Sequence, residues 1–432
     1  MFRVTQFMQE LRNPSAVGPK RRPPPGDVQG RTRVGRSQHP ASRDTGTSLY
    51  GAGGRMPGAA PVVIWNLIRR CNLTCKHCYS ISADKDFPGE LSIEEVFRVM
   101  DDLKAFAVPA LILSGGEPLL RPDIDEISRR AKAMGFYVGL SSNGTLIDER
   151  NIERIAATGY DYVGISIDGI EDTHDRFRRK IGAYDASMAA VRLCRRHGIK
   201  VGLRFTMTRD NAQDLPALLD LLDAEGIDKF YFSHLNYAGR GNVNRKDDAM
   251  LQTTRWAMDL LFDTCWRYLE RGAAKEFVTG NNDADGVYLL FWVRRHFPEL
   301  AEHIGAKLRQ WGGNASGLNV ANIDNLGNVH PDTMWWHYSL GNVRERPFSE
   351  IWRDTSDPLM AGLKRQPRPV SGRCGDCCYL SICGGNTRVR AQQLTGDPWA
   401  EDPACYLSDE EIGLEQTRVR LQVTPYSRQQ GV

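Results

Sequence analysis

The chain has 432 residues, of which 41% are apolar and 25% are charged, so it can bury a large core and form two or three domains. No apolar run reaches the roughly 18 to 20 residues that cross a membrane, and the start of the chain has no apolar signal core. We therefore expect a cytoplasmic protein with no membrane partner. The ten cysteines cluster at metal-like spacings, which favours metal ligation in a reducing compartment over disulfide bonds.

The net charge of +3 hides a basic segment between residues 19 and 55. This segment holds eight Lys or Arg residues against two Asp, and it is rich in Pro, Gly and Ser. Burial cannot offset its ordering entropy, so we expect residues 1–60 to be an N-terminal segment with a disordered insertion. Because aromatic residues are not interleaved with the basic ones, we expect no nucleic-acid partner.

From residue 61 to about 235, short β-rich runs alternate with longer amphipathic stretches. We predict strands at 62–67, 110–114, 136–141, 161–167, 199–206 and 229–234, with helices near 92–106, 122–134, 148–158, 184–197 and 213–225. Six strand–helix repeats predict an α/β fold whose parallel sheet curves into a partial (β/α)6 TIM-like barrel. Such folds place their chemistry at the carboxyl ends of the strands.

The remainder of the chain changes character twice. The pattern over 251–310 predicts helices, short Gly- and Asn-rich strands follow, and a cysteine-rich segment begins at Cys374. Cys194 and Cys265 fall within helical runs, where a small buried hydrophobe is expected. We therefore predict a core over 61–275, a helical connector over 276–315, a cysteine-rich domain over 316–410 and a tail over 411–432.

Three cysteines, Cys71, Cys75 and Cys78, lie on the loop after the first predicted strand. They supply three thiolates where a [4Fe–4S] cluster normally takes four, which would leave one iron open to another ligand. A structural zinc site is the alternative. It needs a fourth Cys or His nearby, and His77 is badly placed because it lies between two of the ligands.

Polar turns follow the next three predicted strands. They read Ser114-Gly115-Gly116-Glu117-Pro118, Ser141-Ser142-Asn143-Gly144-Thr145 and Ser166-Ile167-Asp168-Gly169, with Arg178 a short way beyond the last. Glycines at strand ends often serve only tight turns, and ordinary turn and cap chemistry explains Asn143 and Asp168 equally well.

The cysteine spacing and these turns together resemble the signature of radical S-adenosylmethionine (SAM) enzymes. The resemblance implies that the open iron binds SAM and that one electron from the cluster releases a 5′-deoxyadenosyl radical. It implies that the turn Gly115–Pro118 binds the methionyl ammonium, and that Ser166 and Arg178 bind the methionyl carboxylate. It also places His77 near the adenine. The resemblance also implies that Ser142, Asn143 and Asp168 belong to the turns that bind the cofactor.

A second group of cysteines lies near the C-terminus: Cys374, Cys377, Cys383 and Cys405. Four thiolates suffice for a closed [4Fe–4S] cluster, although zinc suits the same set. The group resembles the SPASM/twitch extension of radical enzymes, which often holds two auxiliary clusters. Thr387 stands where that pattern has its next cysteine, and the upstream ligands are absent, so the resemblance implies one auxiliary cluster for electron transfer. Cys378 could substitute as a ligand.

Over most of its length the chain resembles the radical enzymes of haem d1 biosynthesis, including Met1–Pro14, Trp65–Arg70 and Asn328–Asp332. The resemblance implies that the substrate is 12,18-didecarboxysirohaem, which loses its propionate side chains at C3 and C8. A reductant such as flavodoxin or ferredoxin would supply electrons. Arg204 and Arg240 are candidate partners for substrate carboxylates.

The run His330–His337 holds two tryptophans and two histidines, which could line a pocket for a flat macrocycle; aromatic packing is the alternative. Two other functions stay open. A radical enzyme that modifies a ribosomal peptide would share the core and the cysteine extension, and a non-catalytic iron–sulfur carrier or sensor would not cleave SAM.

Overall fold

The computed structural model describes residues 1–13, 60–249, 251–273 and 275–414. The predicted basic insertion and the tail from residue 415 onward lie outside the described residues. Among those described, no helix is both long and apolar enough to cross a membrane.

The described residues form one curved sheet of eleven strands in the order β1-β8-β7-β6-β5-β4-β3-β2-β9-β10-β11. Six neighbouring strands run parallel at the predicted positions: β2 (Val62–Asn66), β3 (Ala110–Ser114), β4 (Tyr137–Ser142), β5 (Tyr162–Ser166), β6 (Val201–Met207) and β7 (Lys229–His234). The predicted α/β class and partial barrel are therefore confirmed.

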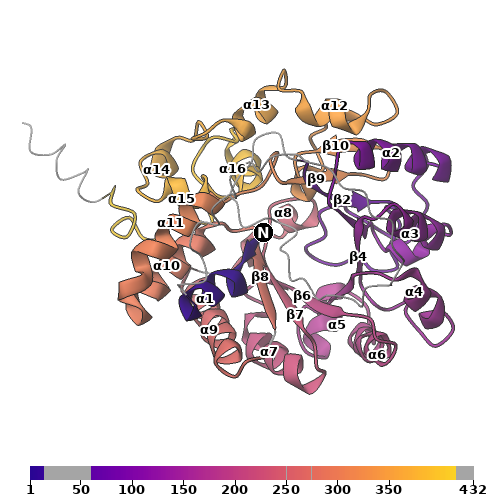
Figure 1. The fold of residues 1–432 in the computed structure, drawn as a ribbon, viewed down its shortest axis with the longest axis horizontal. Helices are drawn as coiled ribbons and strands as arrows, with labels where there is room; N and C mark the ends of the chain where they lie inside the picture. The colour runs from indigo at the N-terminus through magenta and orange to yellow at the C-terminus, as the bar shows by residue number, and fades with distance from the viewer. Residues whose placement is uncertain (14–59, 250, 274, 415–432) are drawn as a thin grey trace, which may run out of the picture.

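Helices cover the outside of this sheet (Figure 1). They are α2 (Ile93–Ala105), α3 (Ile124–Ala133), α4 (Ile152–Thr158), α5 (Asp172–Arg178), α6 (Ala183–Arg196) and α7 (Leu215–Ala224). Helix α2 begins with a capping box, in which the Ser92 hydroxyl accepts from the Glu95 N–H and the Glu95 carboxylate accepts from the Ser92 N–H. The short helix α5 was not predicted from the sequence.

The sheet continues past the predicted boundary of the core at residue 275. Residues Glu276–Gly280 form β8, which pairs in parallel with β7, so this part of the predicted helical connector is a strand. The first residues of the chain add β1 (Phe2–Arg3), antiparallel to β8, and helix α1 (Val4–Arg12). The remaining helices of this region are α9 (Leu251–Glu270), α10 (Ala284–His296) and α11 (Ala301–Trp311). A one-turn helix, α8 (Arg240–Val243), follows β7.

The C-terminal third returns to the opposite edge of the sheet. Strand β9 (Val320–Ile323) pairs in parallel with β2, and β10 (Asn328–His330) and β11 (Gly341–Asn342) follow it in antiparallel order. Five helices complete the described chain: α12 (Phe348–Arg353), α13 (Pro358–Lys364), α14 (Gly372–Gly375), α15 (Leu380–Cys383) and α16 (Arg388–Thr395). In Figure 1 this yellow-orange segment lies along one side of the barrel.

Strand β6 shows how the core and the functional face are separated. Leu203, Phe205 and Met207 are fully buried, whereas Arg204 and Thr206 between them are half-buried. Because alternate side chains of a strand point to opposite faces, the intervening residues can face the inside of the barrel. Both line the cavity described next.

Candidate active site

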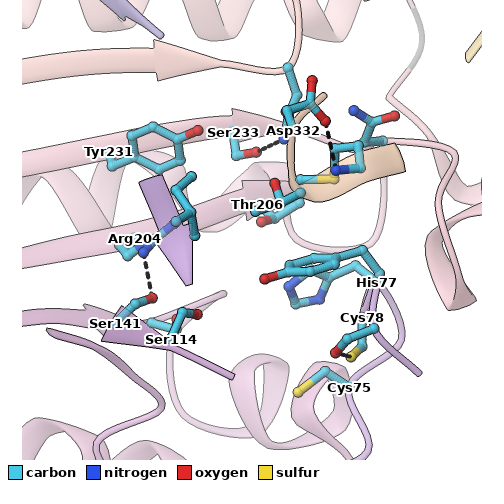
Figure 2. A pocket seen from close by; sticks show the side chains of 18 of the residues that line it. Cys75, His77, Cys78, Ser114, Ser141, Arg204, Thr206, Tyr231, Ser233 and Asp332 are labelled. Atoms are coloured by element: carbon cyan, nitrogen blue, oxygen red, sulfur yellow. Dashed lines mark hydrogen bonds between the residues drawn. The ribbon is translucent and has the colours of Figure 1, made fainter. Parts of the chain in front are cut away.

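The three predicted cluster ligands face one cavity at the carboxyl ends of the parallel strands. Cys71 and Cys75 are buried, Cys78 is half-buried, and all three line the cavity (Figure 2). Burial, followed by the nearby Glu117, raises the pKa of the Cys71 thiol to about 12. Such a thiol needs a bound cation to become a thiolate at neutral pH, because metal binding displaces its proton.

Cys78 behaves differently from its neighbours. Burial acts to raise its pKa, but Arg240 and the Ser80 hydroxyl outweigh burial and lower it. The Sγ atoms of Cys78 and Cys75 each lie near a polar group, at 3.3 Å from the Ser80 Oγ and 3.5 Å from an Arg178 nitrogen. Hydrogen bonds of this kind to cluster sulfurs adjust the electronic properties of a bound cluster.

The turn after β3 lies flat against the cysteine loop because it contains two glycines. A Cβ atom on Gly115 would lie 2.5 Å from the Ile68 carbonyl oxygen, and one on Gly116 only 2.2 Å from that of Arg70. Because neither residue has a Cβ atom, the Gly116 N–H can donate to the Ile68 carbonyl oxygen at 2.6 Å. The glycines therefore let the turn pack directly on the backbone at the start of the cysteine loop, where any side chain would clash.

Glu117, the acidic residue of this turn, is fully buried and is not among the residues that line the cavity. Its carboxylate accepts from the Ser142 hydroxyl at 2.9 Å and from the Asn143 N–H at 2.8 Å, which joins the turns after β3 and β4. Burial raises the pKa of Glu117 to about 7 despite these donors. Pro118 begins a short 3-10 helix, Pro118–Leu120.

Asn143 reaches from the turn after β4 to the cysteine loop. Its Nδ2 atom donates to Asn72 at 2.9 Å and lies 3.9 Å from the Cys71 Sγ, while its Oδ1 atom accepts from Thr145. Asn143, Ser142 and Ser166 all line the cavity. The structure thus brings these three predicted residues together with the cysteines.

Asp168 and Arg178 form a buried ion pair beside the cysteine loop. The other Asp168 oxygen accepts from the Thr206 N–H at 2.7 Å, which ties the end of β5 to β6. Arg178 lines the cavity, and Asp168 is not among the lining residues. Asp168 therefore holds Arg178 beside the cysteine loop, a role that differs from ordinary turn or cap chemistry. His77 also lines the cavity, and burial lowers its pKa to about 4.

The sequence did not predict that Arg240 makes hydrogen bonds to the cysteine loop. Gly239 and Gly241 flank Arg240 after β7, and a Cβ on Gly239 would lie 2.3 Å from the Tyr79 carbonyl oxygen. The Arg240 guanidinium donates to the carbonyls of Cys75 at 2.7 Å and Ser82 at 2.9 Å. Arg240 therefore holds the loop. A Gly-Arg-Gly turn after a parallel strand was the available signal, but its partners are backbone atoms far away in sequence.

The C-terminal third contributes further residues to the lining of the cavity. Residues from this part that line it include Asn314, Ser316, Asp332, Thr333, Met334 and Thr387. Trp335 instead packs in a small buried core with Leu359 and Leu363, and His337 is exposed. The aromatic run is thus largely packing: His330 and Trp336 stack on each other at 5.9 Å, and neither is among the lining residues.

In the second cysteine group, Cys374 lies in α14 and Cys383 ends α15. Burial, and then the other three thiols of the group, raise the pKa of Cys383. Cys374 accepts from the Asp402 N–H at 3.4 Å, and Cys377 accepts from the Tyr379 N–H at 3.4 Å. Cys378 is exposed. Thr387 is hydrogen-bonded to Asn281 at 3.0 Å.

The residue types suit the implied cofactors, but among the described residues no three Cys, His, Asp or Glu side chains are arranged to hold a metal ion. Three thiols on one loop line the same cavity as Gly115, Gly116 and Arg178, a set that suits a [4Fe–4S] cluster with one iron free for SAM. The second group offers four thiols, a number that suits a fully ligated cluster.

Fold and site together define a class of protein, the radical SAM enzymes. The family model described as Radical SAM superfamily matches residues 65–222. SuiB of Streptococcus suis bound to S-adenosylmethionine superposes with a TM-score of 0.63 at 19% identity, covering 81% of this chain and 78% of that one. At this identity the likeness shows the fold alone.

Closer relatives narrow the class. The chain is 57% identical to Pre-heme d1 synthase of Dinoroseobacter shibae, over 85% of this chain and 91% of that protein. It is 46% identical to Fe-coproporphyrin III synthase of Methanosarcina barkeri, over 82% of this chain and 89% of that protein. The chain therefore belongs to the radical SAM superfamily and, within it, to the family of pre-heme d1 synthase. It is an enzyme that uses a [4Fe–4S] cluster and SAM, so the non-catalytic carrier is excluded.

Proposed function

We propose that this protein removes the C3 and C8 propionate side chains of 12,18-didecarboxysirohaem in haem d1 biosynthesis. The observation that supports this most directly is the 57% identity to Pre-heme d1 synthase over 91% of that relative. A tetrapyrrole substrate is favoured over a ribosomal peptide for the same reason. We further propose that flavodoxin or ferredoxin supplies the electrons and that the enzyme is cytoplasmic.

The proposed roles at the first site follow from the contacts. Cys71, Cys75 and Cys78 hold the cluster, and the backbone of the Gly115–Gly116 turn faces the methionyl group of SAM. Arg178, fixed by Asp168, binds the methionyl carboxylate together with Ser166.

The proposal assigns roles at this site to two further residues, His77 and Glu117. His77 lies beside the adenine, against the Phe177 ring at 4.9 Å. Glu117 joins the turn at Gly116 to the turn at Asn143 by hydrogen bonds. In this proposal it positions the backbone groups that bind the methionyl ammonium.

The chemistry requires a radical because the C–H bonds of a propionate are unactivated. When bound, the cluster and SAM supply a 5′-deoxyadenosyl radical that can abstract hydrogen from such a carbon. The chain's own contribution is to orient the two reactants and exclude water, which the buried cysteine loop and the covering C-terminal third allow.

The second site serves electron transfer in this proposal. Cys374, Cys377, Cys383 and Cys405 bind one auxiliary [4Fe–4S] cluster, with no fifth cysteine needed. Full ligation by protein leaves no iron open, so this cluster passes electrons rather than binding substrate.

The test is anaerobic reconstitution with 12,18-didecarboxysirohaem, a reductant and SAM, followed by the amount of 5′-deoxyadenosine and the mass of the pigment. A pigment that has lost two propionate side chains is expected. Formation of Fe-coproporphyrin III would instead give the chain the activity in the name of the Methanosarcina relative. SAM cleavage with an unchanged pigment would overturn the tetrapyrrole assignment, and a Cys75→Ala variant controls for cleavage outside the site.

A further inference from the structure

The cavity holds three arginines whose charges are compensated in different ways. Arg178 is paired with the Asp168 carboxylate, and Arg240 donates to two backbone carbonyls of the cysteine loop. Arg204 donates to the Ser141 hydroxyl and lies over the Tyr231 ring, with its Cζ atom 5.2 Å from the ring centroid. Among the described residues neither Arg204 nor Arg240 pairs with a carboxylate, and the buried Nη2 atom of Arg240 has no hydrogen-bond partner there.

The inner wall of the barrel is shaped around the Arg204 side chain. Arg204 lies on β6, yet it reaches Ser141 on β4, two strands away. It crosses β5 at Gly164, where a Cβ atom would lie 3.0 Å from the Arg204 Cδ. A glycine at this position leaves the space that the side chain occupies, so the guanidinium is held in a built position.

Polar groups around the same cavity also lack partners. Asn236 on the loop after β7 is 6% exposed and lines the cavity, and neither its Oδ1 nor its Nδ2 atom has a hydrogen-bond partner among the described residues. A buried amide without partners is costly, which indicates that a polar ligand completes it. The cavity is therefore equipped for a ligand that carries anionic and polar groups.

Arg204 stands apart from the cysteines. Figure 2 shows Arg204, Ser141 and Tyr231 together at one side of the cavity and Cys75 and Cys78 at another. The proposed SAM carboxylate site, at Arg178, lies beside Cys75. An anion at Arg204 therefore belongs to a second molecule in the cavity.

We infer that Arg204, positioned by the Ser141 hydroxyl and the Tyr231 ring, binds a carboxylate of the tetrapyrrole substrate. This contact determines which propionate of the substrate faces the radical. This rests on the proposed tetrapyrrole function. A guanidinium held over an aromatic ring with a hydroxyl at its side presents its free N–H groups to a carboxylate in a fixed plane. Arg204 is a specificity-determining residue in this account, distinct from the SAM-binding residues.

The experiment compares wild-type protein with Arg204→Gln and Arg204→Lys, reconstituted with both clusters. Arg209→Gln is the matched control, since Arg209 lies just beyond the same strand, is exposed and pairs with Asp247 at 3.1 Å. Affinity is measured by absorbance titration with two probes, 12,18-didecarboxysirohaem and its fully methyl-esterified form. The change in the electron paramagnetic resonance (EPR) spectrum of the reduced cluster on adding SAM is measured in parallel.

Wild type and Arg209→Gln should prefer the free acid over the ester. In Arg204→Gln the affinity for the free acid should fall about 10- to 100-fold and the preference over the ester should shrink by the same factor. Arg204→Lys should lie between, and the SAM-induced EPR change should persist in both variants. The lysine variant and the ester comparison keep the test informative if the glutamine variant does not fold.

Three results would overturn the inference. An unchanged acid-to-ester preference in Arg204→Gln and Arg204→Lys, with wild-type turnover intact, removes only the role of Arg204. Loss of the SAM-induced EPR change with unchanged tetrapyrrole affinity reassigns Arg204 to the SAM carboxylate. Failure of wild-type protein to bind the tetrapyrrole removes the inference together with the proposed function.

Discussion

Gly116→Ala tests whether the contact between two backbone segments builds the radical site. The new Cβ atom would lie 2.2 Å from the Arg70 carbonyl oxygen and 2.4 Å from that of Arg69. To reach ordinary contact at 3.4 Å, the cysteine loop must move by about 1.2 Å. The obstacle is backbone on both counts, so no side-chain rotation relieves it.

A displacement of about 1 Å at a catalytic centre can cost about 100-fold in rate. We therefore expect Gly116→Ala to form 5′-deoxyadenosine about 100 times more slowly than wild type in the presence of dithionite and SAM. Overpacking should also lower the free energy of unfolding by about 1 to 3 kcal/mol. Iron content and circular dichroism, measured on the same samples, separate loss of the cluster from loss of the fold.

The matched control is Gly305→Ala in helix α11. There the nearest atom to an added Cβ is 3.5 Å away, and alanine favours a helix by up to about 1 kcal/mol over glycine. Its activity should equal that of wild type. Wild-type rates and iron content in Gly116→Ala would refute the claim that the close contact at Gly116 positions the cysteine loop, because a clash of this size cannot leave the loop in place.

Three further predictions concern other parts of the chain. Arg240→Gln removes two hydrogen bonds to the cysteine loop, so the cluster should lose iron to a chelator about tenfold faster than in wild type; equal rates would show that Arg240 does not hold the loop. Cys383→Ser should lower the iron content from about eight to about four atoms per chain, while Cys378→Ser should leave it at about eight; iron analysis that ranks the two variants in the opposite order would reassign the ligand. His174, which accepts from the Asp168 N–H at 3.0 Å, has its pKa lowered by burial to about 4. Since the unfolded chain takes up that proton near pH 6.5, apo protein should lose about 2 kcal/mol of unfolding free energy through this group by pH 5. His174→Asn should lose correspondingly less in urea titrations at pH 7 and pH 5, and an identical pH dependence would contradict the assignment.

The six parallel strands and their helices were predictable because each strand is a short β-rich run between amphipathic stretches. Strand β8 was missed because Glu276–Gly280 has only Phe277 and Val278 as large apolar residues, whereas β3, of equal length, is an apolar run. Only the edge of β7 reveals it as a strand. The rule that chemistry lies at the carboxyl ends of parallel strands correctly placed Cys71 and the turn at Gly116 on one cavity.

The sequence could not reveal contacts that depend on three-dimensional neighbours. Arg240 was predicted as a candidate partner for substrate carboxylates; its Nε and Nη1 atoms donate to the carbonyls of Cys75 and Ser82, while its Nη2 atom has no partner among the described residues. Asp168 was predicted to bind the cofactor, which stays a prediction; the structure adds the contacts of its carboxylate with Arg178 and Thr206. In each case the residue type indicated a charged side chain at the site, and only the fold shows which groups that side chain contacts.

The most direct measurement of the central claim is the EPR spectrum of a protein that carries the first cluster alone, made with Cys374 and Cys383 both changed to Ser. A cluster held by Cys71, Cys75 and Cys78 has an iron without a protein ligand, so adding SAM to the reduced, oxygen-free protein should change the signal. A spectrum that SAM leaves unaltered would contradict an open iron in this loop.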